Sequence, residues 1–257
     1  MCCNEINCFQ FFFNEGKYIA LKNYLYNYLL RKRSIGKNLQ HENPELILEV
    51  GSGISPVMTL TDRIIYSDLS LSALRILKQN HKKGLYVVAD SMCLPFKTGV
   101  FSHTISSEVL EHLEDDREAL KELARVMKPL GQLIVTFPHR KFYFSHDDRF
   151  VNHYRRYEIH EMEERLISAD LRPYYVQKVL GPIDKIIMNV VIYSFMIFKK
   201  YPHRKTNETK GSQFSKPFVS VFKWANRFFM ILAMLDNWIM PRALSTVILI
   251  KAEKSDK

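Results

Sequence analysis

Short apolar runs alternate with amphipathic stretches along most of this chain from residue 46 onward. Such alternation is typical of βα units, in which helices separate the strands of a parallel sheet. The runs that we expect to form strands are 46–50, 63–66, 85–89, 100–105, 132–137, 174–179 and 246–252. Stretches with apolar residues at helical spacing lie between them, at 69–77, 120–127 and 158–169. The pattern therefore predicts an α/β fold.

Two further regions flank or interrupt this alternation. Residues 9–30 carry apolar side chains at mixed helical spacing and predict an N-terminal helix or helix pair, followed by a polar linker over 34–44. A long segment precedes the last predicted strand and contains the apolar runs 186–198 and 228–235. A minimal α/β domain does not require such a segment. We expect four parts: a helical segment 1–45, a core 46–180, a helical insert 181–244, and the last strand and tail 245–257.

The formal net charge of +10 is concentrated in that insert. Residues 181–245 hold ten basic and three acidic side chains, among many aromatic and aliphatic ones. A solvated surface is the simple interpretation, but this combination is also typical of a surface that contacts an anionic membrane or a nucleic acid. The run 186–198 is too short to span a bilayer, which needs about 20 residues. Its alternatives are a buried helix and an interfacial or substrate-facing helix.

Overall composition favours a globular protein in a reducing compartment. Hydrophobic residues make up 47% of the chain and charged residues 25%. The cysteines show neither zinc-ligand spacing nor a disulfide framework; they are Cys2, Cys3, Cys8 and Cys93. Polar and charged residues follow the apolar run 11–13 at once, so we expect no secretory signal and a cytoplasmic protein.

A glycine-containing turn follows the first predicted strand. Gly51 and Gly53 come directly after Glu49-Val50, where missing side chains allow a ligand to approach the backbone. A pyrophosphate-binding turn needs a third glycine, and here that position is Ser55, followed by Pro56. The turn therefore favours an adenosine cofactor without phosphates, such as S-adenosylmethionine, over a dinucleotide.

Acidic residues end the next two predicted strands. Asp68 is placed to accept hydrogen bonds from both hydroxyls of a ribose. Asp90 can accept one from an adenine amino group, while Ser91 and Met92 offer backbone groups to the ring. Each acid could instead cap the following turn or helix. Because the carboxyl ends of these strands share one edge of the sheet, a common ligand site is favoured.

In combination, these motifs resemble the type 11 group of class I S-adenosylmethionine-dependent methyltransferases. The resemblance runs from about Leu46 to Leu171, and the matching stretches are 49–53, 66–70, 89–96, 107–113 and 122–129. It implies a Rossmann-like, seven-stranded sheet, mostly parallel with the last strand antiparallel and helices on both faces. Two departures are visible: Leu130 stands where a glycine is usual, and the helix after Gly53 looks shortened.

The resemblance also implies S-adenosyl-L-methionine as the cofactor. Together with the strand-end argument it assigns the following residues to cofactor binding: Glu49, Gly51, Ser52, Gly53, Asp68, Leu69, Asp90, Ser91, Met92 and Ser107.

Few side chains are needed for methyl transfer, because the sulfonium methyl group is already activated and the enzyme chiefly aligns the acceptor. A general base helps where the acceptor must lose a proton. His112, just past the fourth strand, is the candidate for that catalytic role. The alternative is that Glu111 and His112 begin the next helix and serve structure.

A second cluster, His153, Tyr154, Arg155 and Arg156, resembles the His-x-Arg-Arg-Tyr segment of many relatives, where loops contact the substrate. Adjacent arginines suit a phosphate or carboxylate on the acceptor. The alternative is a loop pinned to the core by Tyr154 and Arg156. His139, His146 and His153 are metal ligands in principle, but a metal site is not expected, because their seven-residue gaps come without a cysteine or a matching carboxylate pattern.

The absence of two motifs limits the classes of methyl acceptor that we expect. Residues 106–109 read Ser-Ser-Glu-Val, not the Pro-Pro-aromatic motif of enzymes that methylate base amino groups, and no Pro-Cys nucleophile is present. Nucleic-acid bases are therefore not favoured. We expect methyl transfer to a small-molecule or lipid-linked acceptor, met at an anionic membrane surface through the insert. The alternatives are a soluble small-molecule methyltransferase whose insert is a lid, and a non-catalytic Rossmann module.

Overall fold

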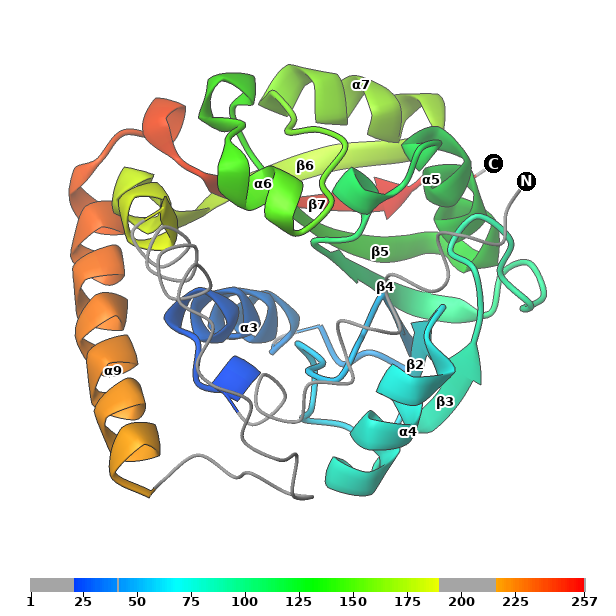
Figure 1. Cartoon of the computed structure of the whole chain (residues 1–257). Helices are drawn as coiled ribbons and strands as arrows, with labels where there is room; N and C mark the ends of the chain where they lie inside the picture. The colour runs from blue at the N-terminus through cyan, green and yellow to red at the C-terminus, as the bar shows by residue number, and fades with distance from the viewer. Residues whose placement is uncertain (1–20, 41, 190–215, 257) are drawn as a thin grey trace.

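The computed structural model describes residues 21–40, 42–189 and 216–256. Its centre is one sheet of seven strands in the order β3-β2-β1-β4-β5-β7-β6, which confirms the expected α/β sheet (Figure 1). Only β7 runs antiparallel to its neighbours. The strands are β1 Ile47–Val50, β2 Ile64–Asp68, β3 Leu85–Val88, β4 Phe101–Ser107, β5 Met127–Pro138, β6 Leu171–Leu180 and β7 Val247–Lys254.

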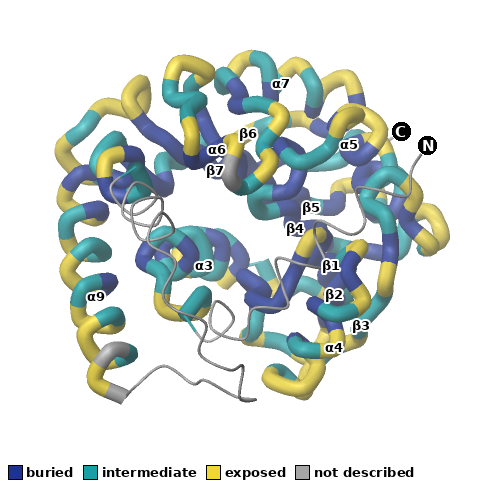
Figure 2. The backbone as a smooth tube through the Cα atoms, viewed as in Figure 1, coloured by how far each residue is buried: buried dark blue, intermediate teal, exposed yellow. Residues whose placement is uncertain are grey.

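Helices cover both faces of the sheet, as the tube coloured by burial shows (Figure 2). One apolar cluster joins the sheet to α5 (Asp116–Val126) and α7 (Ile159–Ser168). The other joins it to α3 (Tyr26–Leu39), α4 (Leu71–Asn80) and α9 (Lys216–Ile239). Residues 182–189 are helical as well. Shorter elements lie near the carboxyl edge: η1 Leu110–His112, η2 Lys141–Tyr143, α6 His146–Phe150 and η3 Arg242–Leu244.

Several predicted boundaries are wrong for identifiable reasons. The linker expected over 34–44 is helical up to Leu39, because Ile35 and Leu39 are buried against the sheet. The helix expected to stop at Pro129 ends at Val126, where β5 begins. The turn just before Gln132 has Leu130 at φ 58°, in the left-handed region that favours glycine.

The second apolar run of the insert lies in a helix that is longer than the run itself. The predicted run 228–235 lies within α9, which has 24 residues. The predicted run 186–198 is helical to residue 189, and its remainder lies outside the described residues, as do residues 1–20. Within the described chain, no helix is both long enough and apolar enough to cross a membrane.

The loop after β1 has lost the helix that a βα unit would place there. Residues 51–63 form turns and bends only. Helix α3 holds part of this loop, since the Tyr28 hydroxyl donates a hydrogen bond to the Pro56 carbonyl oxygen at 2.7 Å. The expected shortening is thus complete.

Candidate cofactor and acceptor site

A cavity of about 310 Å³ opens at the carboxyl ends of β1, β4 and β5. Its walls include the turn after β1, the end of β4 with η1, helix α3, the segment from α6 to Arg156, and the helical residues 182–189. The β1 turn contributes Gly51, Ser52 and Ser55. Ser107 and His112 line it from the β4 side. The cavity therefore brings together predicted cofactor residues and the predicted catalytic residue.

The β1 turn is closely packed and holds two buried polar side chains. Gly51 has φ +63°, and a Cβ built on it would lie 2.4 Å from Cγ2 of Val109. The hydroxyls of Ser52 and Ser55 are buried and have no hydrogen-bond partner among the described residues. Buried hydroxyls without partners are costly, and a polar ligand would satisfy them. These features fit the amino-acid end of S-adenosylmethionine.

Glu49, in β1, forms hydrogen bonds to the backbone of the loop that continues from this turn. Its two carboxylate oxygens accept hydrogen bonds from the backbone N–H groups of Val57 and Met58, at 2.8 and 3.0 Å. Burial raises the pKa of this carboxyl to about 8, against the opposing effect of those two hydrogen bonds. Glu49 thus orders the loop that replaces the missing helix.

Asp68 ends β2, which lies next to β1, and Asp90 follows β3, the edge strand beyond β2. The Asp68 carboxylate accepts hydrogen bonds from the N–H groups of Gly53 and Ser70, both at 2.8 Å, and burial raises its pKa. Asp90 accepts one from the Met92 N–H at 2.9 Å. Each carboxylate has remaining acceptor capacity for ribose or adenine groups. Both lie outside the lining of the 310 Å³ cavity.

Helix α5 fixes the loop that follows Asp90, a contribution that sequence reasoning missed. The Arg125 guanidinium donates to the carbonyl oxygens of Leu94 and Phe96, at 2.9 and 2.8 Å. Glu122 accepts from the Leu94 N–H at 2.8 Å and pairs with Arg125. Both residues belong to the matched stretch 122–129, and this match was the only feature of the sequence that could have pointed to them.

The β4 side of the cavity carries opposite charges. Glu108 has φ 56°, which is uncommon for a residue with a side chain and recurs at functional sites. It pairs at 3.0 Å with Arg31 of α3, which sequence reasoning also missed because only tertiary packing brings α3 here. Lys22, which precedes α3, also lines the cavity, and burial lowers its pKa to about 8.

His112 sits in η1, beside the ring of His153 at 4.7 Å between centroids. Burial and the neighbouring His153 lower the pKa of His112 to about 4. Such a ring is neutral at pH 7 and a weaker base than imidazole in water. The carboxyl of Glu111 is fully buried, and that burial, followed by the charge of Glu108, raises its pKa. The role of His112 as general base stays a prediction.

The predicted substrate residues divide into two pairs. His153 and Arg156 line the cavity, and both contact Asp148, at 3.0 and 2.8 Å. Tyr154 and Arg155 do not line it: Tyr154 is half exposed, and Arg155 pairs with Asp116 at 3.1 Å.

Buried ion pairs hold this side of the cavity together. Lys185, from the helical residues 182–189, bonds to Asp147 and Asp148. The hydrogen bonds from His153, Arg156 and Lys185 hold the pKa of Asp148 well below its usual range, against the opposing effect of burial. Asp147 and Asp148 therefore serve as anchors for the cationic side chains.

This strand order and the glycine turn after β1 define the class I S-adenosylmethionine-dependent methyltransferase fold. Residues 48–135 match the family described as "Methyltransferase domain". This matched stretch is about a third of the chain and agrees with the resemblance found in the sequence; the methyl donor of that family is S-adenosyl-L-methionine.

Known proteins are similar to part of this chain in sequence and to most of it in fold. An uncharacterized protein of Methanocaldococcus jannaschii is 34% identical over 101 residues, which are 38% of this chain and 43% of that protein. Demethylmenaquinone methyltransferase of Streptomyces griseus is 28% identical over 110 residues, 41% of this chain and 48% of that one. The matches thus span about half the length of these relatives. A Thermotoga maritima structure titled a possible histamine N-methyltransferase has a TM-score of 0.62 and 15% identity, over 97% of this chain and 99% of that one.

Proposed function

We propose that this protein transfers the methyl group of S-adenosylmethionine to a small-molecule acceptor bound in the 310 Å³ cavity. The observation that carries the proposal is that one cavity is lined both by unpartnered serine hydroxyls of the β1 turn and by charged and imidazole side chains of the facing wall. A methyltransferase-domain turn supplies two buried, unpartnered serine hydroxyls, and the facing wall supplies charged and imidazole groups.

Cofactor binding is assigned to the turn and the two strand ends. Ser52 and Ser55 would meet the polar amino-acid end, and the glycine backbone would allow close approach. Asp68 would accept from the ribose hydroxyls and Asp90 from the adenine. When bound, the cofactor supplies an activated methyl group on a sulfonium ion.

The chain's own residues would orient the acceptor and exclude water. The acceptor atom gains the methyl group, the S–C bond electrons stay on sulfur, and the sulfonium becomes a neutral thioether. Arg156 offers a cationic partner for an anionic group on the acceptor, and His112 is the candidate to receive a proton from it. Alignment accounts for most of the expected rate enhancement.

The test is transfer of a radiolabelled methyl group from S-adenosylmethionine to fractionated small-molecule and lipid extracts. We expect label in an extractable product with wild type and with Asp62→Ala, an exposed acid paired with Lys83 at the opposite end of β2. Asp68→Ala should lose it. Absence of labelled product from every fraction with wild type would contradict the proposal.

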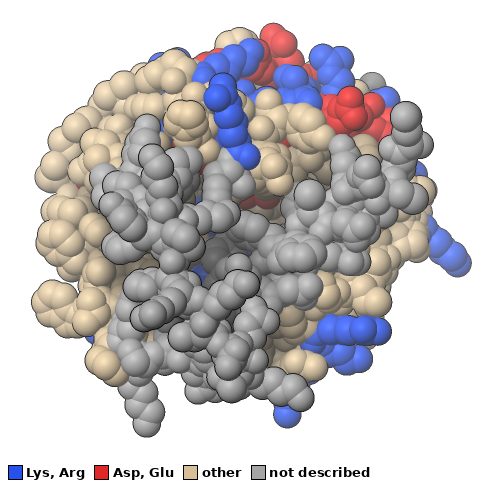
Figure 3. Space-filling model, viewed as in Figure 1, with Lys and Arg blue, Asp and Glu red and all other residues tan. Residues whose placement is uncertain are grey.

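A lipid-linked acceptor at a membrane surface is the second candidate, and the outer face of α9 favours it. Exposed apolar side chains repeat along this helix at a spacing of three or four residues: Val221, Trp224, Phe228, Ile231, Leu235 and Trp238. Trp224 and Trp238 are 74% and 83% exposed. In Figure 3 the side of the molecule where α9 lies shows mainly uncharged atoms. An exposed apolar stripe with tryptophans suits the interfacial region of a bilayer.

Basic residues accompany the stripe, since Lys223 and Arg227 belong to α9 and Arg242 follows it. Most of the predicted basic excess of the insert lies in residues 190–215, outside the described part of the chain. Among the described residues, membrane contact is therefore supported mainly by the exposed apolar side chains of α9.

Flotation with phosphatidylserine-containing liposomes at low salt tests this candidate. The double variant Trp224→Glu/Trp238→Glu should lose the binding of wild type. The matched control Leu60→Glu/Leu85→Glu adds the same charge at exposed leucines elsewhere and should float like wild type. Failure of wild type to float would leave the insert as a lid of an enzyme that takes its acceptor from solution.

A further inference from the structure

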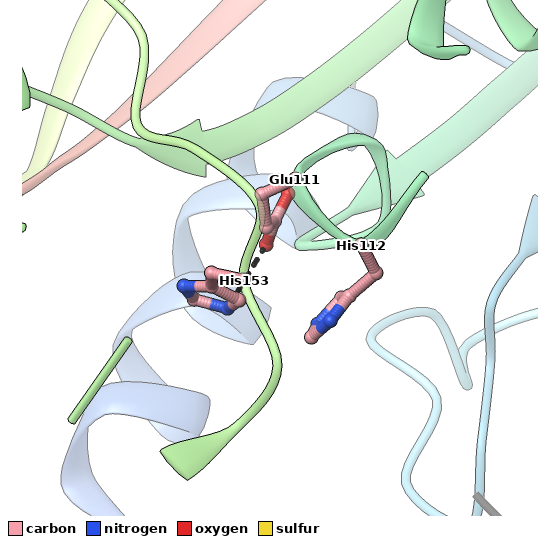
Figure 4. A group of neighbouring side chains, drawn as sticks. All are labelled: Glu111, His112 and His153. Atoms are coloured by element: carbon pink, nitrogen blue, oxygen red, sulfur yellow. Dashed lines mark ion pairs between the residues drawn. The ribbon is translucent and has the colours of Figure 1, made fainter. Parts of the chain in front are cut away.

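The structure brings together three potential metal ligands that the sequence spacing did not suggest. Glu111 and His112 lie in η1, and His153 reaches them from the loop after α6 (Figure 4). One ligand atom from each side chain lies within 4.8 Å of the others. His112 and His153 also line the cavity, so a cation bound here would face the acceptor space.

Glu111 is the member of this group that most needs a partner. Its side chain is 0% exposed, and neither carboxylate oxygen has a hydrogen-bond partner among the described residues. The Nε2 of His153 lies 3.8 Å from its Oε1, beyond hydrogen-bonding distance. A buried carboxylate without hydrogen bonds costs several kcal/mol, and a coordinated cation would offset that cost.

The two histidines are held in the way that metal-binding histidines usually are. The Nδ1 of His153 lies 3.0 Å from an oxygen of Asp148, and that of His112 lies 3.3 Å from the carbonyl oxygen of Asn152. An acceptor at Nδ1 keeps the proton there, so that Nε2 is the ring nitrogen that would bind a metal. Arg156 and Lys185 fix Asp148 in place, which orients His153 further.

We propose that Glu111, His112 and His153 bind a divalent transition-metal cation, Mn²⁺ or Zn²⁺, on the acceptor side of the cavity. Two imidazoles and one carboxylate suit these ions better than Mg²⁺ or Ca²⁺, which prefer oxygen ligands alone. Three protein ligands leave a coordination position for a ligand in the cavity.

A role for this cation rests on the proposed function. A hydroxyl oxygen of the acceptor that coordinates the cation would release its proton to water more readily. The resulting oxygen anion would take the methyl group, with the S–C bond electrons remaining on sulfur. The acceptor class is then a hydroxyl compound, and the product an O-methyl ether.

Mn²⁺ titration, followed by loss of the free-ion signal in electron paramagnetic resonance, tests the site directly, with Zn²⁺ as competitor. We expect one ion per chain, displaced by Zn²⁺. Glu111→Gln and His153→Gln should each weaken binding at least about tenfold. The control His103→Gln removes a histidine paired with Glu42 at 3.1 Å at the far end of β4, and should bind like wild type.

Two results would overturn the metal site: no Mn²⁺ or Zn²⁺ binding by wild type, or equal affinity in wild type and both ligand variants. Thermal melting of each variant shows whether it is folded, and either ligand variant alone suffices for the comparison. Calorimetry of S-adenosylmethionine binding in the presence of EDTA separates the two proposals. Cofactor binding without metal binding contradicts only the metal site, and metal binding without cofactor binding contradicts only the proposed function.

Discussion

At the scale of single residues, Glu49 shows how a predicted site residue can have a structural task. The sequence places it at the end of β1, in the matched stretch, and predicts contact with the cofactor. In the structure its carboxylate accepts from the backbone of Val57 and Met58. Those partners lie in an irregular loop, for which no periodic pattern exists, so the sequence could not reveal them. Contact with the cofactor stays a prediction.

Glu49 also makes the stability of the protein depend on pH. Its pKa is raised from 4.5 to about 8 by burial, so the folded state favours the protonated carboxyl. The stability that this gives is fully present below pH 4.5 and is lost as the pH rises through about 8. Urea unfolding of wild type and Glu49→Gln should show the advantage of wild type falling between pH 5 and pH 8. A difference independent of pH would contradict the raised pKa.

Gly51 is the residue at which backbone geometry matters most. Gly51→Ala should destabilise the protein by about 2 kcal/mol more than Gly99→Ala. Both glycines have positive φ, +63° and +73°, but only at Gly51 would a Cβ meet a side chain, at 2.4 Å from Val109. Urea unfolding of the two variants separates the clash from the backbone strain that they share. Equal losses would show that Val109 moves aside without cost.

At the scale of elements, the existence of the seven strands was predictable and their ends less so. Alternating apolar runs identified all seven strands, because buried strands of a parallel sheet are nearly continuously apolar. β2 and β4 nevertheless run on to Asp68 and Ser107, past the apolar residues, because pairing with neighbours continues to the sheet edge. The prediction ended helix α3 too early, because Ile35 and Leu39 are buried but stand among polar residues in the sequence.

Helix α5 gives a prediction at this scale, since it holds the loop after Asp90. Arg125→Met should raise the Kd for S-adenosylmethionine about tenfold, because Leu94 and Phe96 lose charge-assisted hydrogen bonds from the guanidinium. Lys121→Met is the matched control on the same helix, since Lys121 pairs with the exposed Glu118. Calorimetry with both variants makes the comparison. An unchanged Kd for Arg125→Met would mean that the loop keeps its conformation without α5.

At the scale of the whole molecule, the sheet edge explains why the site could be predicted in part. Residues at the ends of β1, β2 and β4 are close in space because parallel strands end at one edge. On the opposite wall, Arg31 was not predicted and His153 was predicted only through the resemblance, because they reach the cavity through the packing of α3 and the return of the α6 loop. Neither contact leaves a periodic signal in the sequence.

The central claim is that this fold binds S-adenosylmethionine at the β1 turn and the end of β2. The most direct test is calorimetric binding of S-adenosylmethionine and S-adenosylhomocysteine, with NAD as control, to wild type, Asp68→Ala and the surface variant Asp62→Ala. We predict micromolar binding of both sulfur ligands to wild type and Asp62→Ala, no binding of NAD, and loss of binding in Asp68→Ala. Absence of binding of either sulfur ligand to wild type would contradict the account.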